Sequence, residues 1–309
     1  MSSDTVSSTG QELQPAGQWS YEEAFSRNLG LINPSEQQRL RGSRVAIAGL
    51  GGVGGIDLVA LARLGIGKFT IADPDVFEPC NTNRQYGATR SAEGRFKAEV
   101  MRDVVLDINP EAEIRMFCEP IGPDNAAGFL AGADVFVDAI DAFEIDLRRL
   151  LYGKAQQNGI YALGAGPFGF STGWFVFDPK GMTFDRYYDL TDQMTAAEKF
   201  AAFVAGAAPA STHRPYMDMS YVNVEKQTAP SAGFACHLAS GAVAAEVLKI
   251  LLGRGRIYPA PYAHQFDAYR GIYVRKHLWG GNRHPLQRWK RRRLLTVVSQ
   301  QTSGGRHHT

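Results

Sequence analysis

Short apolar runs alternate with segments of helical character along the first half of the chain. Apolar runs predict buried strands over residues 44–48, 68–73, 113–117, 134–139 and 161–164. Between them, Ala- and Leu-rich or amphipathic stretches predict helices over residues 55–64, 93–106, 125–130 and 146–157. This alternation is typical of a mostly parallel sheet flanked by helices. The sequence therefore predicts the α/β fold class.

The pattern changes after Gly166. Residues 171–177 are β-branched and aromatic and predict a strand, and residues 272–275 predict a late strand, so we expect antiparallel strands to continue the sheet in the C-terminal half. Residues 179–232 show little alternation and include an Ala-rich stretch. A helix is expected over residues 235–252, where Gly253 would end it.

The two ends of the chain differ from the middle. Residues 1–18 are polar and rich in Ser, Thr and Gln, which predicts a disordered segment without a signal peptide. Residues 20–42 are expected to be helical with an interruption at Pro34, and a basic tail is expected over residues 281–309. We therefore expect one main domain over residues 19–280.

Composition narrows the class of protein. The chain has 309 residues, 44% of them hydrophobic, and a formal net charge of +2, which does not by itself indicate a nucleic-acid or membrane partner. Its three cysteines form no CxxC pair, which argues against a disulfide framework and a zinc knuckle. We expect no apolar run as long as the ~20 residues that span a membrane. We therefore interpret the chain as a cytoplasmic protein.

A glycine-rich segment follows the first predicted strand. Gly49, Gly51, Gly52 and Gly54 match G-x-G-x-x-G between a strand and a helix, and Asp73 ends the next strand. Glycines let backbone N–H groups approach phosphates, and an acid at this position can bind ribose hydroxyls. The segment predicts a Rossmann-like nucleotide site, but it does not separate a dehydrogenase from an enzyme that uses ATP.

Further polar motifs favour ATP. Asp75 follows Asp73, and after it come the run of residues 81–85 (NTNRQ), Lys97, and Asp141 just beyond the fourth predicted strand. A triphosphate needs cations beside it and an acid that can bind Mg²⁺. Arg84 and Lys97 can supply the charge, and Asp141 lies where α/β sheets place ligands.

In this order of motifs the chain resembles the ThiF/MoeB/HesA family of ubiquitin-activating-type adenylyltransferases. The motifs are Arg27-Asn28, residues 49–54 (GLGGVG), 73–75 (DPD), 81–85, Lys97 and 138–141 (DAID). The resemblance covers residues 20–178 well and resumes over residues 241–251. It implies a homodimeric enzyme that activates a carboxylate with ATP and Mg²⁺.

The resemblance also implies roles for single residues. The four glycines and Asp73 would bind the nucleotide, with Asn81, Arg84 and Lys97 on the triphosphate. Asp141 would coordinate Mg²⁺ or orient the reacting phosphate, and Arg27 would reach the γ-phosphate of the neighbouring subunit. Asp75 and Gln85 are counted with the nucleotide site, although Asp75 could equally cap a turn and Gln85 could be structural.

The chain departs from many relatives in its cysteines. It lacks the two CxxC pairs that bind structural zinc in those proteins, so no zinc is expected. Residues 179–232, expected to cover the adenylate and help select the substrate, contain no cysteine, which argues against a thioester in that segment. Cys236 is interpreted as structural.

Three functions remain open at this level. The favoured one is activation of the C-terminus of a small carrier protein or peptide, or of a small carboxylate, as an acyl-AMP. The alternative resembles the tRNA threonylcarbamoyladenosine dehydratase branch, in which basic residues 288–293 and Trp289 would contact RNA; a solvated tail is the plainer interpretation of that run. A non-catalytic nucleotide-binding homologue is the third. An NAD dehydrogenase lacks support beyond the glycine motif.

Overall fold

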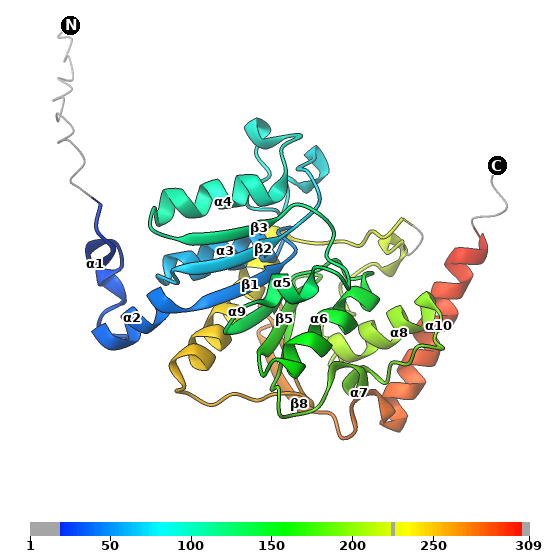
Figure 1. The fold of residues 1–309 in the computed structure, drawn as a ribbon. Coiled ribbons are helices and arrows are strands. Elements are labelled where there is room, and N and C mark those ends of the chain that lie inside the picture. Colours follow the sequence, from blue (N-terminus) through cyan, green and yellow to red (C-terminus); the bar gives the residue numbers. More distant parts are fainter. Residues whose placement is uncertain (1–18, 224–225, 305–309) are drawn as a thin grey trace, which may run out of the picture.

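The computed structural model describes residues 19–223 and 226–304, and a single sheet organises them (Figure 1). Its strands are β1 (Arg44–Ala48), β2 (Lys68–Ala72), β3 (Glu113–Phe117), β4 (Val135–Asp138), β5 (Tyr161–Phe168), β6 (Ser171–Phe177), β7 (Tyr262–Asp267) and β8 (Ile272–His277). The helices are α1 (Tyr21–Ala24), α2 (Pro34–Gly42), α3 (Gly54–Arg63), α4 (Lys97–Ile108), α5 (Ala126–Leu130), α6 (Ile145–Gln157), α7 (Phe184–Tyr188), α8 (Ala196–Ala207), α9 (Gly233–Leu252) and α10 (Pro285–Gly304).

The strand order is β3-β2-β1-β4-β5-β6-β7-β8. Strands β1 to β5 are parallel, whereas β6, β7 and β8 are added antiparallel. This confirms the predicted α/β, Rossmann-like class with antiparallel strands in the C-terminal half. The chain reverses its direction of winding between β1 and β4, and ligands in such sheets bind at the carboxyl ends of the strands at that point.

The sheet is covered on both faces because alternate residues of each strand point to opposite sides. Val45 and Ile47 of β1 pack in one core cluster with side chains of α3, α4 and α9. Ala46 and Ala48 belong to a second cluster with α5, α6 and α7. The near-continuous apolar sequence of β1 follows from this double burial.

Several elements differ from the sequence expectations. Helix α4 begins at Lys97 rather than residue 93, because Phe96 has an extended backbone and Gly94 a positive φ. Residues 20–42 contain two separate α-helices instead of one interrupted helix. Strand β7 and helix α8 had not been predicted; β7 mixes polar and apolar residues, so it lacks the apolar run of the central strands.

The basic segment expected as a tail forms helix α10, which packs on α8 (Figure 1). Gln287 is buried and donates a hydrogen bond to Ala205 O, and Lys290 Nζ donates to Pro209 O. Arg291 pairs with Asp189 at 3.0 Å, whereas Arg288 and Arg292 are exposed. The basic run is therefore divided between packing and solvent. The expected disorder of residues 1–18 lies outside the described residues.

Contrary to expectation, one helix of the described chain is long and apolar enough to span a membrane. Helix α9 has 20 residues and a mean hydropathy of 1.5, and half of the tested window is buried inside the fold. It packs against α3, β5 and β6, and its buried Glu246 accepts a hydrogen bond from Trp174 Nε1. The helix is thus part of the domain core.

Helix α3 carries a fully buried acid, Asp57. Burial raises the pKa of its carboxyl group from 3.8 to about 8, and the nearby hydroxyl group of Ser240 opposes that shift only in part. The folded protein therefore keeps a proton that the unfolded chain releases above pH ~4.

We predict that this acid weakens the fold as the pH rises. Between pH 4 and 8, the free energy of unfolding of the wild-type protein should fall by up to about 1.4 kcal/mol per pH unit more than that of Asp57→Asn. Urea denaturation at pH 5, 6, 7 and 8 measures the difference, with Asp107→Asn on the exposed side of α4 as the control. Parallel pH profiles for wild type and Asp57→Asn would contradict the prediction.

Candidate functional site

The glycine turn connects β1 to α3, and two of its glycines are required by close backbone contact. Gly49 has φ +87°, and a Cβ there would overlap the carbonyl oxygen of Ala139. A Cβ on Gly54 would overlap the carbonyl oxygen of Gly49. Gly49 and Gly54 are therefore needed for the close packing of the turn, as the G-x-G-x-x-G pattern predicts.

The other two glycines leave the N-terminus of α3 open. Within residues 19–223 and 226–304, the N–H groups of Gly51 and Gly52 find no acceptor. A Cβ on Gly51 would lie 3.5 Å from the Gln85 side chain, and one on Gly52 would lie 3.4 Å from Arg84 Cγ. Unpaired N–H groups at a helix N-terminus beside an arginine form a favourable environment for phosphate.

Asp73 fastens this turn to the end of β2. Its Oδ2 accepts from Leu50 N at 2.7 Å and its Oδ1 from Asp75 N at 2.9 Å. Burial raises the pKa of Asp73, and the charge of Lys97 and the two N–H donors oppose that shift. The carboxylate thus orders the loop through contacts within the protein, and its ribose role remains a prediction.

Lys97, at the start of α4, is held by the loop after β2. Its Nζ lies 3.0 Å from Asp75 Oδ2, and its backbone N donates to Asp75 O. The Lys97 side chain is only 8% exposed, whereas that of Asp75 is 67% exposed. Asp75 therefore does more than cap a turn: it positions the cation, and both residues lie next to Asp73.

The loop of residues 81–85 is ordered by its own polar groups. Asn81 Oδ1 accepts from Glu78 N at 3.0 Å, and Arg84 Nη1 donates to Cys80 O and Asn83 Oδ1, both at 3.0 Å. Gln85 is buried beside Gly51, and its Oε1 has no hydrogen-bond partner in the described chain. The structure thus brings Arg84 and Gln85 to the glycine turn.

Asp141 lies in the loop after β4, and a residue that sequence reasoning missed organises this loop. Asp141 is exposed, and one of its carboxylate oxygens accepts from Phe143 N at 3.0 Å. Buried Arg148 of α6 pairs with Asp138 at 2.9 Å and donates to the carbonyl groups of Ile140 and Asp141. No motif marks Arg148, because its partners are identified only once α6 packs beside β4.

Arg27 is the one predicted site residue that lies apart. It is exposed and has no hydrogen bond or ion pair with the residues that the structure describes. The neighbouring Asn28 donates to Leu64 O, at the C-terminal end of α3. The ten residues of α3 span about 15 Å, so Arg27 lies at the opposite end of this helix from the glycine turn.

Comparison of the sequence with models of protein families identifies one family. The model of the ThiF family matches residues 25–287, which is most of the chain. The chain belongs to the ThiF family.

Individual relatives of this ThiF-family chain match less than half of it. The tRNA threonylcarbamoyladenosine dehydratase of Haemophilus influenzae is 35% identical over 145 residues, which cover 47% of this chain and 56% of that protein. The SAMP-activating enzyme E1 of Haloferax volcanii is 34% identical over 121 residues, which cover 38% of this chain and 45% of that protein. The chain thus spans about half the length of these relatives.

The fold itself extends further than this sequence similarity. A crystal structure of E. coli MccB with ATP superposes with a TM-score of 0.64 at 18% identity, covering 84% of this chain and 72% of that one. At this identity the likeness concerns the fold alone.

The buried Cys236 of this ThiF-family chain does not point to thiol chemistry. Cys236, on the first turn of α9, is buried, and burial raises the pKa of its thiol, which keeps it protonated. Its Sγ lies 3.2 Å from where a Cβ on Gly52 would be, so it packs behind the glycine turn. No group of three metal-binding side chains occurs among the described residues, and the expectation of no zinc stays a prediction.

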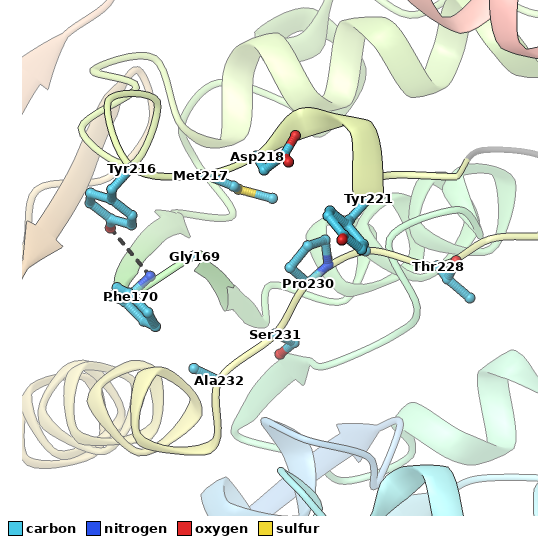
Figure 2. Close-up of a pocket in the computed structure, with 11 residues that line it drawn as sticks. Gly169, Phe170, Tyr216, Met217, Asp218, Tyr221, Thr228, Pro230, Ser231 and Ala232 are labelled. Carbon is cyan, nitrogen blue, oxygen red and sulfur yellow. Dashed lines mark hydrogen bonds between the residues drawn. The ribbon is translucent and has the colours of Figure 1, made fainter.

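Sequence reasoning also missed an open cavity of about 540 Å³ between the β5–β6 turn and the later part of the segment of residues 179–232 (Figure 2). Phe170 lines it from the turn, and Tyr216, Tyr221 and Pro230 line it from the segment. Asn83 Nδ2 donates to Ser231 O at 3.0 Å and so ties the cavity wall to the loop that carries Arg84. No sequence motif brings these elements together.

The glycine turn gives a direct prediction. Gly54→Ala should lower ATP affinity by at least about 10-fold, because the methyl group forces Gly49 away from its place and misaligns the N–H groups of the turn. Isothermal calorimetry with ATP measures the change. Gly128→Ala on α5, where a Cβ meets open space, is the matched control and should leave affinity unchanged. Normal ATP affinity in Gly54→Ala would show that the turn is not the nucleotide site.

Proposed function

We propose that this chain uses ATP to adenylate a carboxylate and releases pyrophosphate. The observation that carries the proposal is the arrangement at the end of β1. There, unpaired N–H groups of Gly51 and Gly52 adjoin Arg84, in the fold position where such sheets bind ligands. Membership of the ThiF family supports the same conclusion.

The reaction would be a nucleophilic substitution at the α-phosphorus of ATP. A carboxylate oxygen forms a bond to the α-phosphorus while the bond to the bridging oxygen breaks, and pyrophosphate leaves with the electron pair. Arg84 and Lys97 would stabilise the negative charge on the phosphates, and the N–H groups of the glycine turn would donate to phosphate oxygens. Asp73 and Asn81 order the loops that carry these groups.

Asp141 is suited to bind Mg²⁺, because only one oxygen of its exposed carboxylate accepts a hydrogen bond from the protein. By contrast, Asp138 is occupied by Arg148 and Tyr152. A bound Mg²⁺ would neutralise phosphate charge and orient the leaving group. Arg148 would then act as a positioning residue, since it fixes the backbone of the Asp141 loop.

The substrate is proposed to be a peptide or carrier-protein C-terminus or a small carboxylate, in a reaction that uses no cysteine of the chain. The buried, protonated Cys236 favours this version. The alternative is dehydratase-like cyclisation on a modified tRNA. Two observations favour it: the 35% identity to the dehydratase over 145 residues, and the exposed Arg288 and Arg292 of α10. A cytoplasmic location remains a prediction.

Asp141→Ala should lower the rate of ATP–pyrophosphate exchange by about 100-fold or more, because the metal-binding acid is lost while the fold is kept. The assay uses [³²P]pyrophosphate with three classes of substrate: short peptides, small carboxylates and threonylcarbamoyl-modified tRNA. Asp107→Ala, exposed on α4, is the matched control. Exchange driven by the tRNA alone would favour the dehydratase-like alternative, and full activity in Asp141→Ala would remove this residue from the mechanism.

Arg27 is proposed to act across a homodimer, because it lies at the far end of α3 from its own glycine turn. Arg27→Ala and Asp141→Ala should each be inactive alone. When they are co-refolded, about a quarter of wild-type exchange should return, since each mixed dimer contains one site with both residues intact. Light scattering establishes the dimer. No recovery in mixed dimers, or full activity in a monomer, would contradict a role in trans.

A further inference from the structure

The cavity beside the nucleotide site has a rigid aromatic wall (Figure 2). The Phe170 ring stacks on Tyr216 at 5.3 Å and on Phe234 at 5.5 Å. Tyr216 OH donates to Asp267 Oδ2 and accepts from Phe170 N. Gly169 has φ +62°, and a Cβ there would lie 2.9 Å from the Tyr216 ring. The wall is therefore held in place by contacts within the protein.

The cavity borders the proposed reaction site. Its lining includes Ser231 and Ala232, which lead directly into α9. A Cβ on Gly233 would lie 2.7 Å from Asn83 O, so this backbone packs against the loop that carries Arg84. One turn later, Cys236 packs behind Gly52. A molecule in the cavity thus has only this thin wall between it and the phosphate-binding turn.

The sheet supports the same placement. Gly164 of β5 pairs with Asp138 at the carboxyl end of β4. Strand β5 continues four residues further to Phe168 before the turn that carries Phe170, which is about 13 Å beyond that end. The cavity accordingly lies beyond the same edge of the sheet as the glycine turn and the Asp141 loop.

The lining determines which chemistry fits. Most of the lining surface is apolar, with Phe170, Met217 and Pro230 among the lining residues, and the described lining contains no Lys, Arg or His. Its one charged group is the carboxylate of Asp218, which accepts from Ser220 N. Such a surface favours a bulky apolar group and disfavours an anionic one. A substrate that ends in glycine would leave most of this volume of about 540 Å³ unfilled.

We propose that this cavity binds a large apolar or aromatic group next to the carboxylate that becomes adenylated. The substrate would then be a peptide ending in a large apolar residue, or an aryl or long-chain carboxylate, rather than a chain ending in Gly-Gly. This inference rests on the proposed adenylation and adds the class of substrate to it.

Two acyl-adenylate analogues test the inference without turnover. We expect 5′-O-[N-(3-phenylpropanoyl)sulfamoyl]adenosine to bind the full-length protein about 10- to 100-fold more tightly than its N-acetyl counterpart, because the phenyl group is buried in the cavity. Calorimetry measures both affinities. In parallel, pyrophosphate exchange with N-acetyl-Ala-Ala-Phe should exceed that with N-acetyl-Ala-Ala-Gly by a similar factor in kcat/KM.

Variants link the preference to the cavity. Phe170→Ala should reduce the preference for the phenyl analogue at least about fivefold by removing part of the wall. Ala229→Trp, on an exposed lining position, should fill the space and reduce the same preference without touching the core. Leu286→Ala, exposed on α10, is the matched control and should keep it.

The possible outcomes separate the two proposals. Equal affinity for both analogues, or equal exchange with both peptides, would overturn the inference while leaving adenylation intact. An unchanged preference for the phenyl analogue in both Ala229→Trp and Phe170→Ala would show that the apolar group binds elsewhere, and would reject this cavity. Binding of ATP without binding of either analogue, together with no exchange for any carboxylate, would reject adenylation itself and the inference with it.

Discussion

The site depends on one constraint, which is the close contact between backbone segments just beyond the carboxyl ends of β1 and β4. Gly49 lies against the carbonyl of Ala139, and Gly54 lies against the carbonyl of Gly49, so neither position has room for a side chain. This packing lets α3 begin directly at the end of β1 with the N–H groups of Gly51 and Gly52 unpaired. The positive end of the helix is thereby presented at the carboxyl edge of the sheet.

The charged groups around that turn are held in place by protein partners. Asp75 holds Lys97, the carbonyl of Cys80 holds Arg84, and Arg148 fixes the loop of Asp141. Two of these contacts lie in the connection between β2 and α4 and the third lies in the loop after β4, and each is made within the protein. Such preorganisation is what electrostatic stabilisation of a charged transition state needs. A buried ion pair such as Arg148–Asp138 contributes little net stability, which agrees with a positioning role for it.

The elements of the chain differed in how far the sequence could predict them. Strands β1, β3 and β6 matched their expected bounds, because each is recognisable from its own residues: β1 and β6 are largely buried and mostly apolar, and β3 alternates polar with apolar residues. Strand β7 and helices α8 and α10 were missed, because their burial depends on partners far away in the chain. Gln287 of α10, for example, is buried only because Ala205 O accepts its amide hydrogen bond.

The sequence by itself determined the parallel α/β core, the strand–glycine–helix turn, and the order of polar residues that marks the ThiF family, because these follow from neighbouring residues and their periodicity. Only the tertiary structure decided that Arg148 organises the Asp141 loop, that Cys236 packs behind Gly52, that Arg27 lies at the far end of α3, and that Phe170 and Tyr216 form one wall of a cavity. Each of these joins residues distant in the chain, and local pattern carries no information about which distant surfaces pack together.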